Sequence, residues 1–439
     1  MKKTISNIVK ILTPDFTHKW LKGFYKYINN IFFKIKLHKV RRNHKRALEV
    51  VRQKNKVKVV FLLIHDSVWK YEGVYRLMEK DDRFDPIIAI CPYTAYSKDI
   101  MIFEINKAFN SFLEKGYKVV KTLKKNGNWL DIKRELNPDL VCFTNPHELT
   151  LKQYLISNFL NTLTCYVPYG FKNSHLYEAH FNKKTQNFVW KFFLETEIHK
   201  KLSKKYSRNN SANTLVTGYP GMDMFIEKGF QPKDIWKIKE KPLKRIIWAP
   251  HHTIPGFGAT LDYSTFFDYC NIMFEIADSY RDKVQFAFKP HPILRAKLSR
   301  DDVWGKEKTD NYYNKWANLD NSILCESDYF DLFLTSDGLI HDSSSFVIEY
   351  LYSGKPELFL IGDDSVKNNF NEVGNMALNV IYLANNKNGV LKFIDDVVIN
   401  GKDFLKKERE VFFNDIIKPP NNNSASQNIF NYLVNEFFE

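Results

Sequence analysis

Short apolar runs alternate with helix-length segments along most of the chain after residue 56. The runs predict buried strands, and the longer segments between them predict helices. In the first half the predicted strands are residues 57–64, 86–91, 140–144, 162–167 and 214–216, and the clearest helices are residues 71–80 and 99–115. In the second half the predicted strands are residues 246–249, 284–288, 322–324, 338–340 and 357–361. This alternation is typical of parallel sheets with helices on both faces.

The two series predict an α/β protein with two doubly wound, Rossmann-like domains that face a cleft. We expect a basic helical arm at residues 1–56, an N-terminal Rossmann-like domain at 57–226, a C-terminal one at 240–400 and further helices at 401–439. The lysine-rich segment 228–244 is the expected linker. Because ligands of such sheets bind at the carboxyl ends of the strands, we expect both domains to contribute to one site.

Composition excludes two simple classes of protein. With 439 residues, of which 44% are hydrophobic and 15% aromatic, the chain is too long for a single small module and too apolar for a disordered protein.

The longest apolar run, residues 59–64, is far shorter than the roughly 20 residues that cross a bilayer. The N-terminus lacks a cleavable signal pattern, so we expect a cytoplasmic protein. The five scattered cysteines are expected to be reduced core residues, not disulfides or zinc ligands.

Positive charge is concentrated in the first 56 residues. This segment holds 16 Lys and Arg residues against two acidic ones, a net charge of +14 out of +15 for the whole chain. Within it, residues 20–39 repeat apolar side chains every three or four positions, which predicts an amphipathic helix; these side chains are Trp20, Phe24, Ile28, Ile31, Phe32 and Ile35. We expect residues 1–46 to bind an anionic membrane surface. A helix packed on the body is the alternative, and without a recognised module we expect no nucleic-acid binding.

The densest candidate for chemistry follows the predicted strand 338–340. There the chain reads His341, Asp342 and three successive serines, Ser343, Ser344 and Ser345, before a predicted helix that carries Glu349. Free backbone N–H groups and serine hydroxyls at a helix start favour a phosphate group, and a diphosphate would fit there. An ordinary helix cap is the simpler interpretation.

Histidines follow two other strands of the second half. Lys289-Pro290-His291-Pro292 comes directly after the strand 284–288, where two prolines fix one imidazole at the expected cleft. Such a histidine can act as a general base or stabilise phosphate charge. His251 and His252 follow the strand 246–249, and we expect only one of them to line the cleft, because neighbours in an extended chain point opposite ways. We assign no metal ligand.

The first half offers a weaker candidate after the strand 162–167. Tyr169 and Gly170 follow this strand, and His175 lies a few residues further on. Gly170 would allow close approach of the backbone to a ligand, although an ordinary turn explains it equally well.

Four motifs, in this order, make the region 160–360 resemble the CDP-glycerol glycerophosphotransferase family, which builds teichoic acids and related capsule polymers in bacteria. They are Gly-Tyr-Pro-x-x-Asp, Trp-Ala-Pro, Lys-x-His-Pro and Asp-x-Ser-Ser with an acid in the following helix. The matching residues are Gly218, Tyr219, Pro220 and Asp223; Trp248, Ala249 and Pro250; Lys289, His291 and Pro292; and Asp342, Ser344, Ser345 and Glu349.

The resemblance implies a GT-B fold, a CDP-linked donor and transfer of a polyol phosphate to a hydroxyl of a growing polymer or lipid-linked acceptor. It assigns the acceptor to the first domain and the donor to the second. It implies neither a cofactor nor an essential metal. It places the enzyme on the inner face of the cell membrane. His291 and the Ser344–Ser345 turn would hold the donor diphosphate, and Glu349 would contact the ribose. Attack by the acceptor oxygen on the β-phosphorus would release CMP.

The sequence departs from the family pattern at two loops. The family's His-Gly-Thr-Pro loop, whose histidine is thought to be a base, has Tyr169 before Gly170 here, which leaves His175, His251 and His252 as substitutes. Its Trp-Ala-Pro motif is normally followed by Thr-aromatic-Arg, and here His251 and His252 follow instead. A glycosyltransferase that uses a nucleotide sugar remains an alternative, because one two-domain cleft serves both reactions. A non-enzymatic protein that binds membranes or polyanions is a second alternative.

Overall fold

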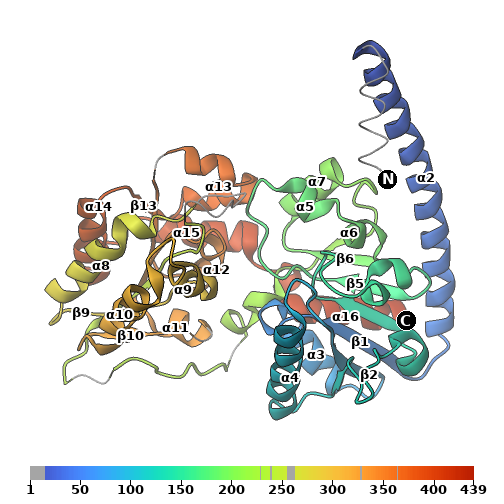
Figure 1. The fold of residues 1–439 in the computed structure, drawn as a ribbon, viewed down its shortest axis with the longest axis horizontal. Helices are drawn as coiled ribbons and strands as arrows, with labels where there is room; N and C mark the ends of the chain where they lie inside the picture. Colours follow the sequence, from blue (N-terminus) through green and yellow to red (C-terminus); the bar gives the residue numbers. More distant parts are fainter. Residues whose placement is uncertain (1–14, 228, 238–239, 255–262, 327–328, 363) are drawn as a thin grey trace.

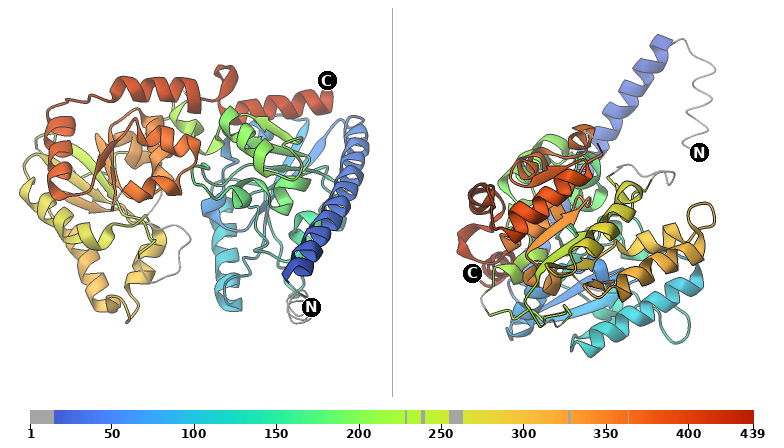
Figure 2. Two further views of the ribbon diagram at one scale, coloured as in Figure 1. Left: turned by 90° about the horizontal axis from the view of Figure 1, so that it is seen from above. Right: turned by 90° about the vertical axis from the view of Figure 1, so that its left-hand side faces the viewer.

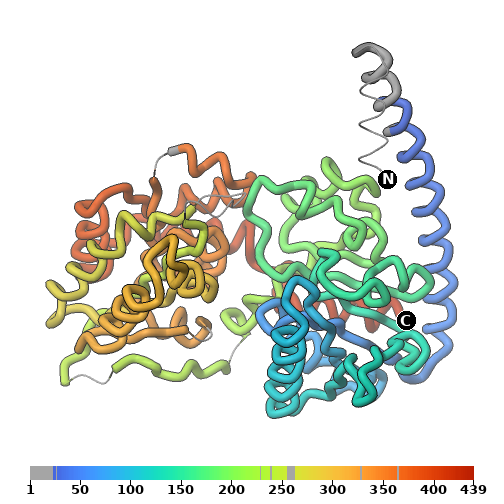
Figure 3. Tube along the Cα trace, viewed as in Figure 1, coloured from blue at the N-terminus to red at the C-terminus, as the bar shows by residue number. Residues whose placement is uncertain are grey.

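The chain folds into two α/β lobes that lie side by side (Figure 1). The computed structural model describes residues 15–227, 229–237, 240–254, 263–326, 329–362 and 364–439. Each lobe is built on an all-parallel sheet, as the alternating pattern predicted. The chain passes from the first lobe to the second after residue 226 and returns near its C-terminus (Figure 3).

The first lobe holds a seven-stranded sheet in the order β3-β2-β1-β4-β5-β6-β7. Its strands are β1 (Val57–Leu63), β2 (Phe84–Ile90), β3 (Val119–Lys121), β4 (Leu140–Phe143), β5 (Leu163–Tyr166), β6 (Lys191–Leu194) and β7 (Thr214–Val216). Helices α3 (Glu72–Glu79), α4 (Lys98–Glu114), α5 (Tyr177–Phe181), α6 (Lys184–Phe188) and α7 (Glu197–Tyr206) connect them. The strands are almost entirely buried, which explains their unbroken apolar sequences.

The second lobe repeats this topology with six strands in the order β10-β9-β8-β11-β12-β13. They are β8 (Lys244–Ala249), β9 (Val284–Phe288), β10 (Ser322–Leu324), β11 (Gly338–His341), β12 (Glu357–Leu360) and β13 (Tyr382–Ala384). The helices are α8 (Phe266–Ser279), α9 (Pro292–Leu298), α10 (Gly305–Asn318), α11 (Phe330–Thr335), α12 (Phe346–Glu349), α13 (Glu372–Leu378), α14 (Lys387–Lys392) and α15 (Lys406–Phe412).

Both sheets reverse their strand order at one point, between β1 and β4 in the first lobe and between β8 and β11 in the second. At such a switch point the connections leave in opposite directions and open a crevice at the carboxyl ends of the strands. The loops after β8 and β11 carry His251 and the serine run, so the fold brings together motifs that lie about 90 residues apart.

All predicted strands are confirmed within one or two residues, and three further strands, β3, β6 and β13, were missed. These three are short, and β3 and β6 each include a lysine, so their apolar runs were too brief to recognise. The five cysteines are free and buried, as expected.

The C-terminal helix α16 (Ala425–Phe438) crosses back and packs on the first lobe (Figure 2). The carboxylate of Asp223 accepts hydrogen bonds from the backbone N–H groups of Ala425 and Ser426 at 2.8 and 2.7 Å. Gly218 has a φ of +95°, and a Cβ there would meet Pro419 at 2.6 Å. The Gly-Tyr-Pro-x-x-Asp motif therefore anchors the returning helix.

The arm is one long helix, α2 (Asp15–Val51), that follows the edge of the first lobe and extends beyond it (Figure 1). Its C-terminal half packs on the body through Leu37, Val40 and Val51, which are buried. Further toward the N-terminus, Phe24 and Phe32 remain 51% and 66% exposed. The predicted helix is thus confirmed, its apolar side chains are not confined to one face over its length, and packing on the body holds for one part only. Residues 1–14 and the side chain of Trp20 lie outside the described part.

A single buried carboxylate fixes the geometry of the second switch point. Asp342, which follows β11 and is 1% exposed, accepts the backbone N–H of His251 at 2.5 Å. Its other oxygen accepts the N–H and the hydroxyl of Thr265 at 2.6 and 3.1 Å. The carboxylate therefore ties the loop after β8 and the start of α8 to the end of β11.

We predict that Asp342→Asn lowers the free energy of unfolding by about 1–3 kcal/mol, because an amide offers one acceptor oxygen and leaves a buried N–H without a partner. Denaturant unfolding measures the change. Asp337→Asn is the matched control, because Asp337 flanks the other end of β11 with a side chain that is 37% exposed; we expect a loss below about 1 kcal/mol there. Equal losses in the two variants would contradict the role of Asp342.

Candidate functional site

Three histidines cluster at the carboxyl edge of the second sheet. The ring centroids of His251 and His252 lie 5.1 and 4.1 Å from that of His291, and 4.4 Å from each other. Both rings of the adjacent pair lie beside His291, although we expected their side chains to point opposite ways. The chain bends at His252, and Asp342 holds the backbone of His251, so the two side chains do not alternate as they would along a strand.

Hydrogen bonding assigns a role to the imidazole of His291. Its Nδ1 accepts the N–H of Ile293 at 3.2 Å as the N-cap of α9. The ring proton of the neutral form therefore lies on Nε2, which can donate to a ligand oxygen. Burial, followed by the charges of nearby groups including His252 and Lys289, lowers the pKa of His291 to about 3, so the ring is neutral at pH 7.

The cluster has the spacing of a metal site, because its ligand nitrogens lie within 4.8 Å of one another. Its surroundings favour an anion instead. The lone pair on Nδ1 of His291 is occupied by Ile293, and Lys297 donates to the carbonyl of His252 at 2.9 Å, which places a positive charge beside the rings. A cation would have to displace that capping bond and approach this ammonium group, whereas a diphosphate would be attracted to it.

The serine run forms a turn between β11 and the short helix α12. Ser345 occupies the N-cap position without a capping hydrogen bond from its side chain, and its hydroxyl lies 3.3 Å from that of Ser343. The helix α12 spans only four residues before it tightens into a 3₁₀ turn, so its dipole is weaker than the sequence led us to expect. The hydroxyls and backbone of the turn are the groups left to hold a phosphate. Ser344 and Ser345 are partly exposed, as a ligand contact requires.

The other predicted donor residues lie deeper. The carboxylate of Asp342 already accepts hydrogen bonds from the backbone of His251 and Thr265, so its role is to position these segments. Glu349 is 4% exposed and accepts a hydrogen bond from Tyr329 at 2.8 Å, so its carboxylate is buried and not open to a ribose in this structure. Lys289 is 5% exposed, directly after β9, and its backbone N–H donates to the carbonyl of Trp248 at 2.8 Å.

The loop after β5 joins the two lobes. The backbone N–H of His175 donates to the carbonyl of Asn369 at 3.0 Å, and that of Asn371 donates to the carbonyl of Asn173 at 2.8 Å. The side-chain amide of Asn173 donates to the carbonyl of Ser344. This loop of the first lobe therefore touches the serine turn of the second, and His175 is part of the bridge.

A buried ion pair supports this bridge. The ammonium of Lys172 lies 3.4 Å from the carboxylate of Glu195, and the two side chains are 5% and 0% exposed. Burial lowers the pKa of Lys172 to about 8, and Glu195 opposes this shift. The carbonyl of Lys172 also accepts the side-chain amide of Asn371 at 2.7 Å, which fixes the loop against the second lobe.

Tyr169 and Gly170 lie at the other end of the same loop. Tyr169 is 41% exposed, and its hydroxyl lies 3.3 Å from Nε2 of His147. A Cβ on Gly170 would meet nothing within 4 Å, so the space beside this backbone is open.

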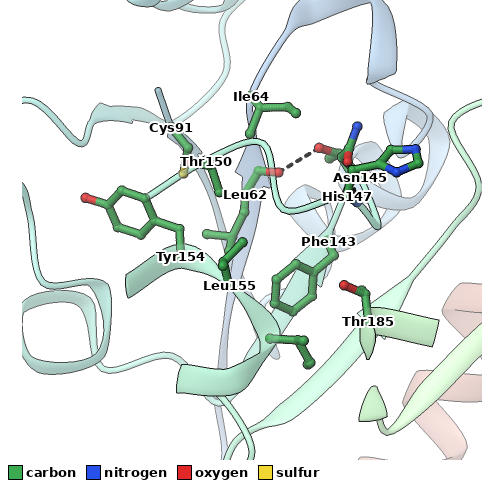
Figure 4. Close-up of a pocket in the computed structure, with 12 residues that line it drawn as sticks. Leu62, Ile64, Cys91, Phe143, Asn145, His147, Thr150, Tyr154, Leu155 and Thr185 are labelled. Atoms are coloured by element: carbon green, nitrogen blue, oxygen red, sulfur yellow. Dashed lines mark hydrogen bonds between the residues drawn. The ribbon is translucent and has the colours of Figure 1, made fainter. Parts of the chain in front are cut away.

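His147 was missed by the sequence analysis. It follows β4 in the sequence Asn145-Pro146-His147, and its position directly after a strand was the available signal. Beneath it lies a small cavity lined mainly by apolar side chains (Figure 4). With a volume of about 20 Å³ the cavity admits about one water molecule, so a substrate must bind outside it.

Comparison with known proteins connects this arrangement to a family. The model of the CDP-glycerol:poly(glycerophosphate) glycerophosphotransferase family matches residues 171–434, more than half of the chain. No curated protein matches the sequence.

Solved structures show the same fold. The wall teichoic acid polymerase TagF aligns with a TM-score of 0.55 and 14% identity, over 95% of this chain and 97% of that one. The UDP-GlcNAc 2-epimerase of Neisseria meningitidis aligns with a TM-score of 0.53 and 15% identity, over 86% of this chain and all of that one. The UDP-GlcNAc 2-epimerase of Methanocaldococcus jannaschii aligns with a TM-score of 0.52 and 16% identity, over 86% of this chain and 99% of that one. Identities this low establish the two-lobed GT-B architecture alone.

The family match carries the functional conclusion, because it covers the interlobe loop, the histidine cluster and the serine turn together. The chain belongs to the CDP-glycerol:poly(glycerophosphate) glycerophosphotransferase family, as a transferase with a CDP-linked donor and a polymer acceptor.

Proposed function

We propose that the donor diphosphate binds at the second switch point, between the histidine cluster and the serine turn. The carrying observation is the joint placement of His251, His291 and the Asp342–Ser345 segment on one edge, held by the carboxylate of Asp342. In this position Nε2 of His291 donates to a phosphate oxygen, and the hydroxyls of Ser344 and Ser345 supply further donors.

The reaction is an in-line displacement at phosphorus. An acceptor oxygen attacks the β-phosphorus of the CDP-linked donor, a new P–O bond forms, and the bond from that phosphorus to the bridging oxygen breaks. CMP leaves with the electron pair of this bond. The donors around the diphosphate stabilise the charge that develops on the phosphoryl oxygens. The first lobe, whose loop touches Ser344 through Asn173, is the side from which the acceptor enters.

We also propose that α2 places the enzyme on the anionic inner face of the cell membrane. Among the described residues, no helix has the length and apolar character of a membrane span. The exposed aromatic and aliphatic side chains of α2 between residues 24 and 35 lie among lysines, as in helices that rest in the headgroup layer. These exposed side chains are Phe24, Tyr25, Tyr27, Ile31, Phe32 and Ile35.

For the donor site, we predict that His291→Ala lowers the rate of CMP release from CDP-glycerol by at least roughly 10²-fold, a typical loss for one group that stabilises charge in the transition state. His291→Asn should lose a similar factor while keeping an N-cap acceptor, which separates chemistry from folding. His65→Ala, on the opposite lobe, is the control and should retain activity.

A wild-type rate in His291→Asn would remove the imidazole from the donor site. Turnover of a nucleotide sugar, with no CMP release from CDP-glycerol, would contradict the proposed donor.

For the arm, we predict that the triple variant Phe24→Ser, Phe32→Ser, Ile35→Ser binds anionic liposomes about 10²-fold more weakly, if each side chain contributes about 1 kcal/mol through partial burial. Liposome co-sedimentation measures this. A deletion of residues 1–46 is a poorer test, because it would also remove the packed Leu37 and Val40. Phe404→Ser, at a site that is 75% exposed on the second lobe, is the control. Equal binding by both variants would contradict the membrane role of α2.

A further inference from the structure

A hydrogen-bonded tyrosine–histidine pair lies at the first switch point. His147 comes from the loop after β4 and Tyr169 from the loop after the neighbouring strand β5. The phenol oxygen of Tyr169 lies 3.3 Å from Nε2 of His147, and the ring centroids are 6.0 Å apart. Tyr169 as a residue is 41% exposed, so it lies at the surface of this edge.

The pair holds the protonation states that transfer toward the histidine requires, a protonated phenol and a neutral imidazole. Partial burial and the neighbouring Tyr93 raise the pKa of the Tyr169 phenol above its usual value, so this group is protonated at neutral pH. Burial, followed by the charges of Lys183 and Lys172, lowers the pKa of His147, so its ring is neutral. A neutral imidazole that accepts the phenol proton at Nε2 carries its own proton on Nδ1.

The pair lies at the loop after β5, where the resemblance to the family places its base. That loop has Tyr169 in this chain, and a phenol that is already protonated can take up a proton only if it passes its own proton to a second group. His175 lies in the interlobe bridge through its backbone, and His291 presents a proton on Nε2 instead of a lone pair. The loop of Tyr169 also reaches Ser344 of the proposed donor site through Asn173.

We propose that His147 is the final proton acceptor of the transfer reaction and that it acts through Tyr169. The inference rests on the proposed function. As the acceptor oxygen attacks the β-phosphorus, its proton passes to the phenol oxygen of Tyr169, and the phenol proton passes to Nε2 of His147. The P–O bond to CMP breaks with its electron pair on CMP. The imidazolium of His147 then releases its proton to water, which restores the pair.

The kinetic test follows CMP release from CDP-glycerol against pH for His147→Gln and Tyr169→Phe. Each variant should lower kcat by roughly 10²–10³-fold and lose the acidic limb of the profile, because the titrating base or its link is gone. The double variant should be no slower than the slower single variant, since the two groups act as one unit. His65→Gln is the matched control, because His65 follows β1 on the same edge but bonds to Ser67 and Asp66; it should keep the acidic limb.

An acidic limb that persists unchanged in His147→Gln, with kcat within threefold of the wild type, would overturn the proposal. If the double variant loses the sum of the two single losses, Tyr169 and His147 do not act together in one proton transfer, and the proposal is wrong.

A second measurement tests the pair without turnover. In the NMR titration of labelled histidine, Tyr169→Phe should raise the pKa of His147, because the phenol hydrogen bond favours the neutral ring. The pKa of His65 should not change. An unchanged pKa of His147 would contradict the hydrogen bond. If the wild type releases no CMP from CDP-glycerol, the proposed donor is wrong. The pKa of His147 in Tyr169→Phe still shows whether the hydrogen bond between the two side chains exists.

Discussion

The buried carboxylate of Asp342 is the interaction on which the proposed donor site depends. It satisfies the backbone N–H groups of His251 and Thr265, which belong to a loop and a helix start that would otherwise be free to separate from β11. Burial raises the pKa of Asp342 to about 6, and the N–H donors oppose this shift, so the group is largely ionised at pH 7. The cost of burying this charge is offset by three hydrogen bonds, and the result is a fixed distance between imidazole and serine loops.

In the proposed mechanism, the two halves of the reaction lie on two sheets of one topology. Each sheet opens a crevice where its strand order reverses, and each crevice carries different chemistry. The second offers hydrogen-bond donors beside lysines, which suit a diphosphate. The first offers a phenol linked to a neutral imidazole, which suits a hydroxyl that must lose a proton. The loop from Phe171 to His175 connects them, stabilised by the buried Lys172–Glu195 pair.

The sequence predicted the fold well because parallel strands are buried on both faces and read as unbroken apolar runs. Short strands such as β3 and β13 were not predicted, because three residues form too short an apolar run to recognise. Packing between distant segments could not be predicted either, because no local pattern in residues 425–438 indicates that α16 returns to the first lobe.

At the site, sequence order identified the loops, because motifs directly after strands must meet at the carboxyl edge. It could not give side-chain direction. The bend at His252 brings two adjacent imidazoles to His291, and Glu349 is buried and accepts a hydrogen bond from Tyr329. His147 has no family motif around it, and only the pairing of β4 with β5 shows that it reaches Tyr169.

The most direct measurement of the central claim is an experimental structure of the enzyme with CDP-glycerol or CDP bound. The account predicts the diphosphate at the carboxyl edge of the second sheet, with phosphate oxygens at about 3 Å from Nε2 of His291 and from the Ser344–Ser345 turn. A nucleotide bound with its diphosphate at the first lobe, or out of reach of both His291 and the serine turn, would contradict it.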